Sequence, residues 1–216
     1  HEHGILLITM MGVSWLVTYL LRQQKLMHLS RLTHDYEHQF KAAKDLLRFA
    51  RFSIYEQPDL YLNLARASID YALSVDEEEQ TNRLSKVAND TLSNMRQLFP
   101  EQRKEEQQVV VQARIYYLKD QIEKAKHLLL ALDKTPVTQG AEDILDKAKA
   151  LHEVGLLSSS RELLRQLTQD TNQLKNADPV FITYLQQEQQ ERESLPMGPR
   201  EFNNNAVLLY ERGQLH

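Results

Sequence analysis

The chain has 216 residues, a formal net charge of −4 and a hydrophobic content of 42%, of which little is aromatic. This length allows one large or two small domains, and the mild charge gives no basic excess that would attract nucleic acid. Cysteine is absent, which excludes disulfide bonds and thiolate metal sites. Glycine and proline are too few for the frequent turns of an all-β protein, so the composition favours long helices with short connections.

The first segment is an uncharged, apolar stretch from Gly4 to Leu21. Its length is at the lower limit of the roughly 17–25 residues that span a membrane, and Arg22 and Lys25 would then place the following chain in the cytoplasm. A docking helix, buried or dimer-forming, is one alternative; residues that are not native to the chain, as the tag-like start at His1 suggests, are another. We treat residues 1–21 as a separate hydrophobic segment, and the sequence as a fragment of a longer protein.

Residues 22–99 have the apolar periodicity of helices. The pattern predicts a helix, a turn near His34 and a second helix before residue 52. A third helix begins at Pro58, because proline suits the first helical position. The acidic run 76–79 is interpreted as a solvated helix start rather than a metal site. A fourth helix follows over 81–99, and Pro100 ends it.

The stretch 109–132 predicts two short helices that meet at Lys119–Asp120, and residues 141–174 predict a second hairpin that turns at Gly155. A linker at 135–140 separates the two hairpins. Three more features follow along the chain: a helix from Pro179 to about Arg192, a break at 195–199, and a helix over 201–212 with a turn at Gly213.

The proposed turns share a spacing of small residues. An alanine precedes each turn by seven residues, and a small residue follows two of them by five. The alanines are Ala113, Ala148 and Ala206, and the residues after the turns are Ala125 and Ser160. Antiparallel helices approach closely only where a side chain is small, so we expect these residues at helix crossings. Aspartate or glycine at the turn tolerates left-handed or capping geometry.

This spacing is similar to that of the tetratricopeptide repeat. The chain also resembles bacterial response regulators in which a chemotaxis-type receiver domain precedes a tetratricopeptide array. The segments that carry this resemblance are Arg22 to Leu26, Asp35 to Glu37, Ser53 and Ile54, Pro58 to Arg66, and Phe202 to Gly213. The resemblance implies an all-α, helical-hairpin solenoid (a tetratricopeptide-like α-α superhelix) over 22–216, with a break near 194–200. It further implies the C-terminal interaction arm of a two-component signalling protein. Separately, we expect a cytoplasmic protein that is not an enzyme.

If the hairpins stack as in a tetratricopeptide array, one side of the first helix of each hairpin faces the groove of the solenoid. The positions concerned are Arg114, Tyr117, Lys149, His152, Asn203 and Tyr210, and by looser analogy also Arg31 and Arg66. The set is basic and aromatic although the chain is acidic overall, so we expect a protein or peptide partner, with an acidic or C-terminal segment favoured. The simpler alternative is that several of these residues are merely solvated. Uncovered apolar ends of the array would also allow a homodimer.

The sequence contains no glycine-rich phosphate loop and no nucleophile motif, so we expect no catalytic residue, cofactor or metal. Ser158 to Ser160 are interpreted as a helix N-cap, and the Asn203 run as either groove-lining amides or a helix cap. The first alternative function is a scaffold anchored by residues 4–21 in the inner membrane. The second is a metal-dependent helical enzyme using His34 and His38, which are four residues apart but lack the zincin order.

Overall fold

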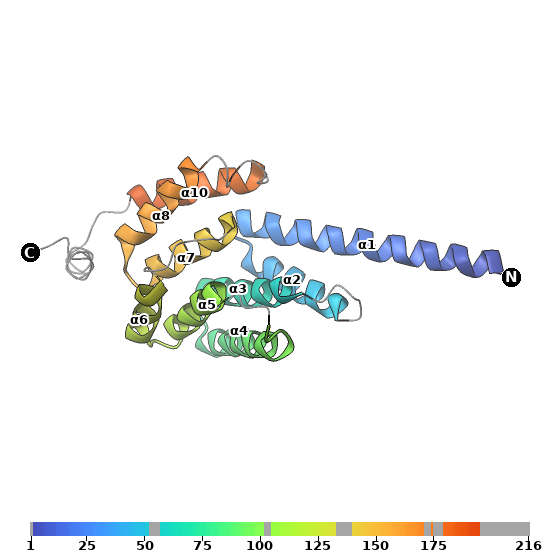
Figure 1. Ribbon diagram of the computed structural model, residues 1–216, viewed down its shortest axis with the longest axis horizontal. Helices are drawn as coiled ribbons and strands as arrows, with labels where there is room; N and C mark the ends of the chain where they lie inside the picture. Colours follow the sequence, from blue (N-terminus) through green and yellow to red (C-terminus); the bar gives the residue numbers. More distant parts are fainter. Residues whose placement is uncertain are drawn as a thin grey trace, which may run out of the picture. The chain divides into compact units, whose positions relative to one another are not determined.

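The computed structural model describes residues 2–51, 57–101, 105–132, 140–170, 174 and 179–194, and its regular structure is entirely helical (Figure 1). No strand occurs in these ranges, which confirms the all-α class. The chain divides into two compact units, His1–Gln102 and Arg103–His216. This division was not predicted from the sequence, because the boundary carries no glycine- or serine-rich linker.

The described residues of the first unit form four helices, each of which packs against the next along the chain. They are α1 (Glu2–Leu32), α2 (Tyr36–Ala50), α3 (Pro58–Ser74) and α4 (Glu78–Leu98). The predicted starts and ends of these helices near His34, Pro58 and Pro100 are therefore confirmed. Residues 76–79 are exposed and Glu78 and Glu79 lie in the first turn of α4, where a carboxylate complements the helix dipole.

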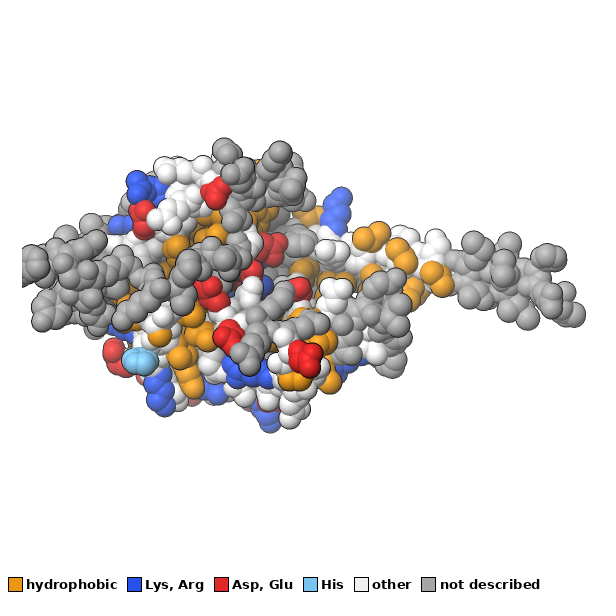
Figure 2. Space-filling view, viewed as in Figure 1, with side chains coloured by type: hydrophobic (Ala, Val, Ile, Leu, Met, Phe, Trp, Pro, Cys, Tyr) orange, Lys and Arg blue, Asp and Glu red, His pale blue; other side chains and the backbone are white. Residues whose placement is uncertain are grey.

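Helix α1 is continuous across residues 21 and 22, where the sequence analysis placed a boundary. Its N-terminal part extends past the other helices of its unit (Figure 1), and apolar side chains are visible along it in Figure 2. Val13, Trp15, Val17 and Leu21 are exposed there. Within the described part of the chain, no helix combines the length and the apolarity needed to cross a membrane.

In the second unit, the described ranges include two helical hairpins and a further helix. The elements are α5 (Glu105–Leu118), α6 (Ile122–Leu132), α7 (Ala141–Glu153), α8 (Leu157–Gln169) and α10 (Pro179–Ser194). Helix α5 packs on α6, α7 packs on α8, and α7 also contacts both helices of the preceding hairpin. This confirms the two predicted hairpins and the predicted helix that begins at Pro179, while α8 ends five residues before the predicted position 174.

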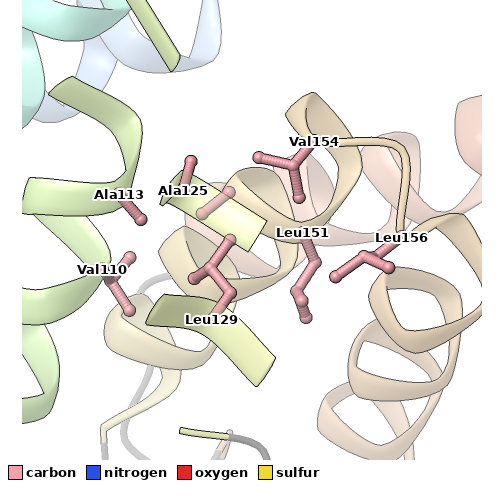
Figure 3. Packing of buried hydrophobic residues seen from close by; sticks show 8 residues of the cluster. Val110, Ala113, Ala125, Leu129, Leu151, Val154 and Leu156 are labelled. Atoms are coloured by element: carbon pink, nitrogen blue, oxygen red, sulfur yellow. The ribbon is translucent and has the colours of Figure 1, made fainter. Parts of the chain in front are cut away.

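The core of the second unit is built from the apolar faces of both hairpins. Figure 3 shows side chains of α5, α6 and α7 and of the turn into α8 directed toward one another. The cluster consists of Val110, Ala113, Ala125, Leu129, Ala150, Leu151, Val154 and Leu156, each at most 4% exposed. Because these residues come from both hairpins, neither hairpin encloses its apolar face alone.

Three helix ends have the same capping geometry. His34, Asp120 and Gly155 adopt positive φ angles of 55°, 57° and 81°. At Asp120 and Gly155 this is the left-handed one of the two geometries, left-handed or capping, that aspartate and glycine tolerate at a turn. After each of these three residues, the next amide donates to a carbonyl five residues back. These bonds are Asp35 N to Ser30 O at 2.8 Å, Gln121 N to Tyr116 O at 2.9 Å and Leu156 N to Leu151 O at 2.8 Å. This is the Schellman cap, which satisfies carbonyls at the end of a helix.

The small residues lie where the helices are buried against each other. Ala113, Ala125, Ala148 and Ser160 are all fully buried. The Ser160 hydroxyl donates to the Ala148 carbonyl at 2.6 Å, which places these two residues at the crossing of α7 and α8. The prediction that Ser158 to Ser160 cap the helix was wrong, because the cap position is Leu156 and makes no side-chain bond. The predicted break at 195–199, Ala206 and the turn at Gly213 lie outside the described residues.

Candidate functional site

Half of the residues predicted to face a groove lie on α5 and α7. Arg114 and Lys149 are buried, with 2% and 7% exposure, whereas Tyr117 and His152 are half-buried. Helices α5 and α7 are the first helices of their hairpins. Arg114 and Tyr117, and likewise Lys149 and His152, are three residues apart and so lie on the same side of their helix. The structure therefore groups the four predicted residues on two helices in contact, but encloses the two cations.

Arg114 is held by a carboxylate on the neighbouring helix. Its Nε lies 3.0 Å from both Glu153 carboxylate oxygens, and its Nη2 donates to Oε1 at 2.6 Å. The Glu153 side chain is 13% exposed. A fork of this kind fixes the orientation of both groups, and in a dry environment it positions helices more than it recognises a ligand. Arg114 therefore acts as a link between α5 and α7.

Two further polar contacts join the same helices near the start of α5. Lys147 Nζ lies 2.9 Å from Glu106 Oε1, and its side chain is only 2% exposed. Gln107 Nε2 donates to Asp143 Oδ2 at 3.1 Å. Residues at the start of α5 thus contact Asp143 and Lys147 of α7. Arg114, which lies further along α5, contacts Glu153, the last residue of α7. The two helices therefore run side by side in the same direction.

The other predicted groove residues do not belong to α5 or α7. Arg31 and Arg66 belong to α1 and α3 in the first unit and are 9% and 7% exposed. Asn203 and Tyr210 lie outside the described residues. Among the described residues of the second unit, Tyr117 and His152 are the predicted ones with appreciable accessible surface. They offer an aromatic face and an imidazole ring for contact.

The two histidines considered for metal binding make local contacts instead. His34 is the left-handed turn residue after α1, and its Nδ1 lies 2.9 Å from the Tyr36 hydroxyl. His38 Nδ1 lies 2.8 Å from an oxygen of Asp35, whose carboxylate also accepts from the His38 amide as the N-cap of α2. These two bonds from His38 lower the pKa of the Asp35 carboxyl. Among the residues that the structure describes, no cluster of three or more His, Cys, Asp or Glu could hold a metal ion.

The pairing of polar side chains between α5 and α7 was not predicted from the sequence. Glu153 lies 39 residues after Arg114, Lys147 lies 41 after Glu106 and Asp143 lies 36 after Gln107. These separations are close to the 35 residues between the turns at Asp120 and Gly155. Complementary polar residues spaced by about one repeat were therefore the available signal, because equivalent positions of stacked hairpins lie side by side.

No family model matches the chain, and neither a curated protein nor a solved structure matches it significantly.

Proposed function

We propose that the chain is a protein-interaction scaffold built as a tetratricopeptide-like solenoid. The observation that carries the proposal is the relation between the two hairpins of the second unit. Both hairpins turn through a Schellman cap and bury small residues at equivalent positions, and α7 lies against both helices of the preceding hairpin. Repeated hairpins of this kind bury their apolar faces on one another and leave a continuous wall for a partner.

The proposed wall is formed by the first helices, α5 and α7. The polar links from Glu106 to Lys147 and from Arg114 to Glu153 keep these helices at a fixed distance. A rigid wall loses little conformational entropy when a partner binds, so shape and a few contacts at Tyr117 and His152 are sufficient for recognition. The mechanism is binding, with no bond made or broken.

The setting we propose is the output arm of a bacterial two-component protein. It is supported by the resemblance of the segments Arg22 to Leu26, Pro58 to Arg66 and Phe202 to Gly213 to receiver–tetratricopeptide regulators. The parent sequence tests this setting: a receiver domain of alternating strands and helices ahead of residue 22 supports it, and a different preceding domain contradicts it.

The scaffold function is tested by site-specific photo-crosslinking in the full chain. A photoreactive amino acid at position 117 should capture a defined partner from a bacterial extract, and the same group at exposed His127 on α6 should not. With the purified partner, His152→Ala should weaken binding by about fivefold or more, because few contacts dominate an interface. The matched variant His127→Ala should bind normally. Equal losses in both variants, or capture through position 127 alone, would contradict the proposal.

A further inference from the structure

A basic pocket lies in the first unit, and residues of α2, α3 and α4 line it. In this unit α2 packs on α3, and α3 packs on α4. It is a cavity of about 680 Å³. Its lining residues are Lys41, Lys44, Asp45, Leu47, Arg48, Arg51, Leu64 and Thr91. Four cations and one carboxylate therefore line this pocket in a chain whose net charge is −4. None of these residues was predicted to be functional from the sequence.

The cations form a row along α2. Lys41, Lys44, Arg48 and Arg51 follow one another at steps of three or four residues, which places them on one side of the helix. At about 1.5 Å of rise per residue the row is roughly 15 Å long. A cation in the last turn complements the helix dipole, which accounts for Arg48 and Arg51 but not for the two lysines further back.

The one carboxylate among the lining residues, that of Asp45, accepts a hydrogen bond from a residue that does not line the pocket. Asp45 accepts a bond from the Tyr19 hydroxyl of α1 at 3.3 Å. At the other end of the row, the Arg51 guanidinium lies 5.5 Å from the centre of the buried Tyr61 ring, and Arg51 Nε lies 3.4 Å from the Tyr61 hydroxyl. This contact restricts the orientation of Arg51 before any ligand arrives, which lowers the entropy cost of binding.

The charged and the apolar lining residues of the pocket differ in their exposure to solvent. Lys41, Lys44, Arg48 and Arg51 are exposed, whereas Leu47, Leu64 and Thr91 are buried. Lys41 also pairs with Glu37, but both side chains are at least half exposed, so a ligand carboxylate exchanges with Glu37 at little cost. The pocket thus combines a charged rim with a floor of two leucines and one hydroxyl.

We propose that this pocket binds an acidic peptide segment of a partner protein, with an apolar side chain on Leu47 and Leu64 and carboxylates along the cations of α2. A single small anion would leave most of a 680 Å³ cavity and most of the row unused. An extended chain advances about 3.3 Å per residue, so roughly five residues match the length of the row. The proposal adds a second binding site, in the first unit, to the scaffold proposed for the second.

The test measures binding of fluorescein-labelled peptides to the full chain by fluorescence anisotropy. The probe is a short peptide of glutamates around a central leucine, and its control has glutamine at every glutamate. We expect the acidic probe alone to bind, with an affinity that falls as salt is raised. The double variant Lys44→Glu/Arg48→Glu should weaken binding by about tenfold or more, because it replaces two attractions by two repulsions. The single variant Arg48→Gln should give a smaller loss.

A matched control is available on α4 in the same unit. Arg83 and Lys86 are exposed and lie outside the pocket, so Arg83→Glu/Lys86→Glu makes the same change in net charge. This variant should retain binding within roughly twofold, since exposed charges at a distance are screened. An equal loss in the control variant would overturn the proposal. Displacement of the probe by inorganic phosphate alone, or tighter binding of single-stranded RNA at the same residues, would also overturn it.

Discussion

Two arginine–carboxylate pairs of the second unit have nearly the same length but opposite surroundings. Arg114 and Glu153, on different helices, are 2.6 Å apart and largely buried. Arg165 and Glu162, on α8, are 2.7 Å apart, with about half of each side chain exposed. The distance between the charged atoms therefore says little about their role. A buried pair between two helices fixes their packing, whereas an exposed pair within one helix contributes little to stability.

The largest expected effect comes from breaking the buried pair. Arg114→Ala should lower the free energy of unfolding by about 3–5 kcal/mol, because it leaves the Glu153 charge without its partner. Arg165→Ala, the same substitution in the exposed pair, should cause no measurable change. Urea unfolding of both variants gives the comparison.

A double-mutant cycle separates the pair from the loss of arginine packing. Arg114→Ala, Glu153→Ala and the double variant should give a coupling energy of about 2 kcal/mol, within the range for contacting residues. A coupling near zero would show that Arg114 stabilises α5 and α7 through its aliphatic stem alone.

A smaller effect is expected from widening the crossing of α7 and α8. Ala148→Leu should destabilise the protein by about 1–3 kcal/mol, because the position is fully buried and the Ser160 hydroxyl reaches its carbonyl. Ala131→Leu on the exposed side of α6 adds the same volume and should change stability by less than about 0.5 kcal/mol. Equal values from thermal unfolding would show that Ala148 does not lie at a close approach of helices.

The smallest effect concerns pH and the exposed pair. Bonds from Gln166 and then Arg165 lower the pKa of the Glu162 carboxyl below its usual value of 4.5. A lowered pKa in the folded state gives stability that is present above pH 4.5 and lost as the pH falls through the lowered value. Glu162→Ala should therefore lower the Tm slightly at pH 7 and by less at acidic pH, where the carboxyl becomes protonated. A difference that grows as the pH falls would contradict this sign.

Local features of the fold were predictable because their causes lie within a few residues. Pro58 and Pro100 delimit helices through steric effects on their own turn, and Asp120 and Gly155 end helices in a left-handed conformation. The alanine spacing predicted where helices cross, since close approach requires a small side chain whatever its partner is. Ser160 was not predictable in this way. As a serine near a turn it was expected to cap a helix, but it is buried and its hydroxyl donates to the Ala148 carbonyl on α7.

The candidate sites were less predictable, because they depend on residues that the sequence separates. The sequence by itself determined the helices, their turns and the small residues at their crossings, through periodicity and backbone geometry that operate over about one helical turn. Only the tertiary structure decided that Arg114 meets Glu153 instead of an open groove, and that Leu64 and Thr91 complete a basic pocket with α2. The physical reason is that burial and charge pairing depend on which distant segments pack together.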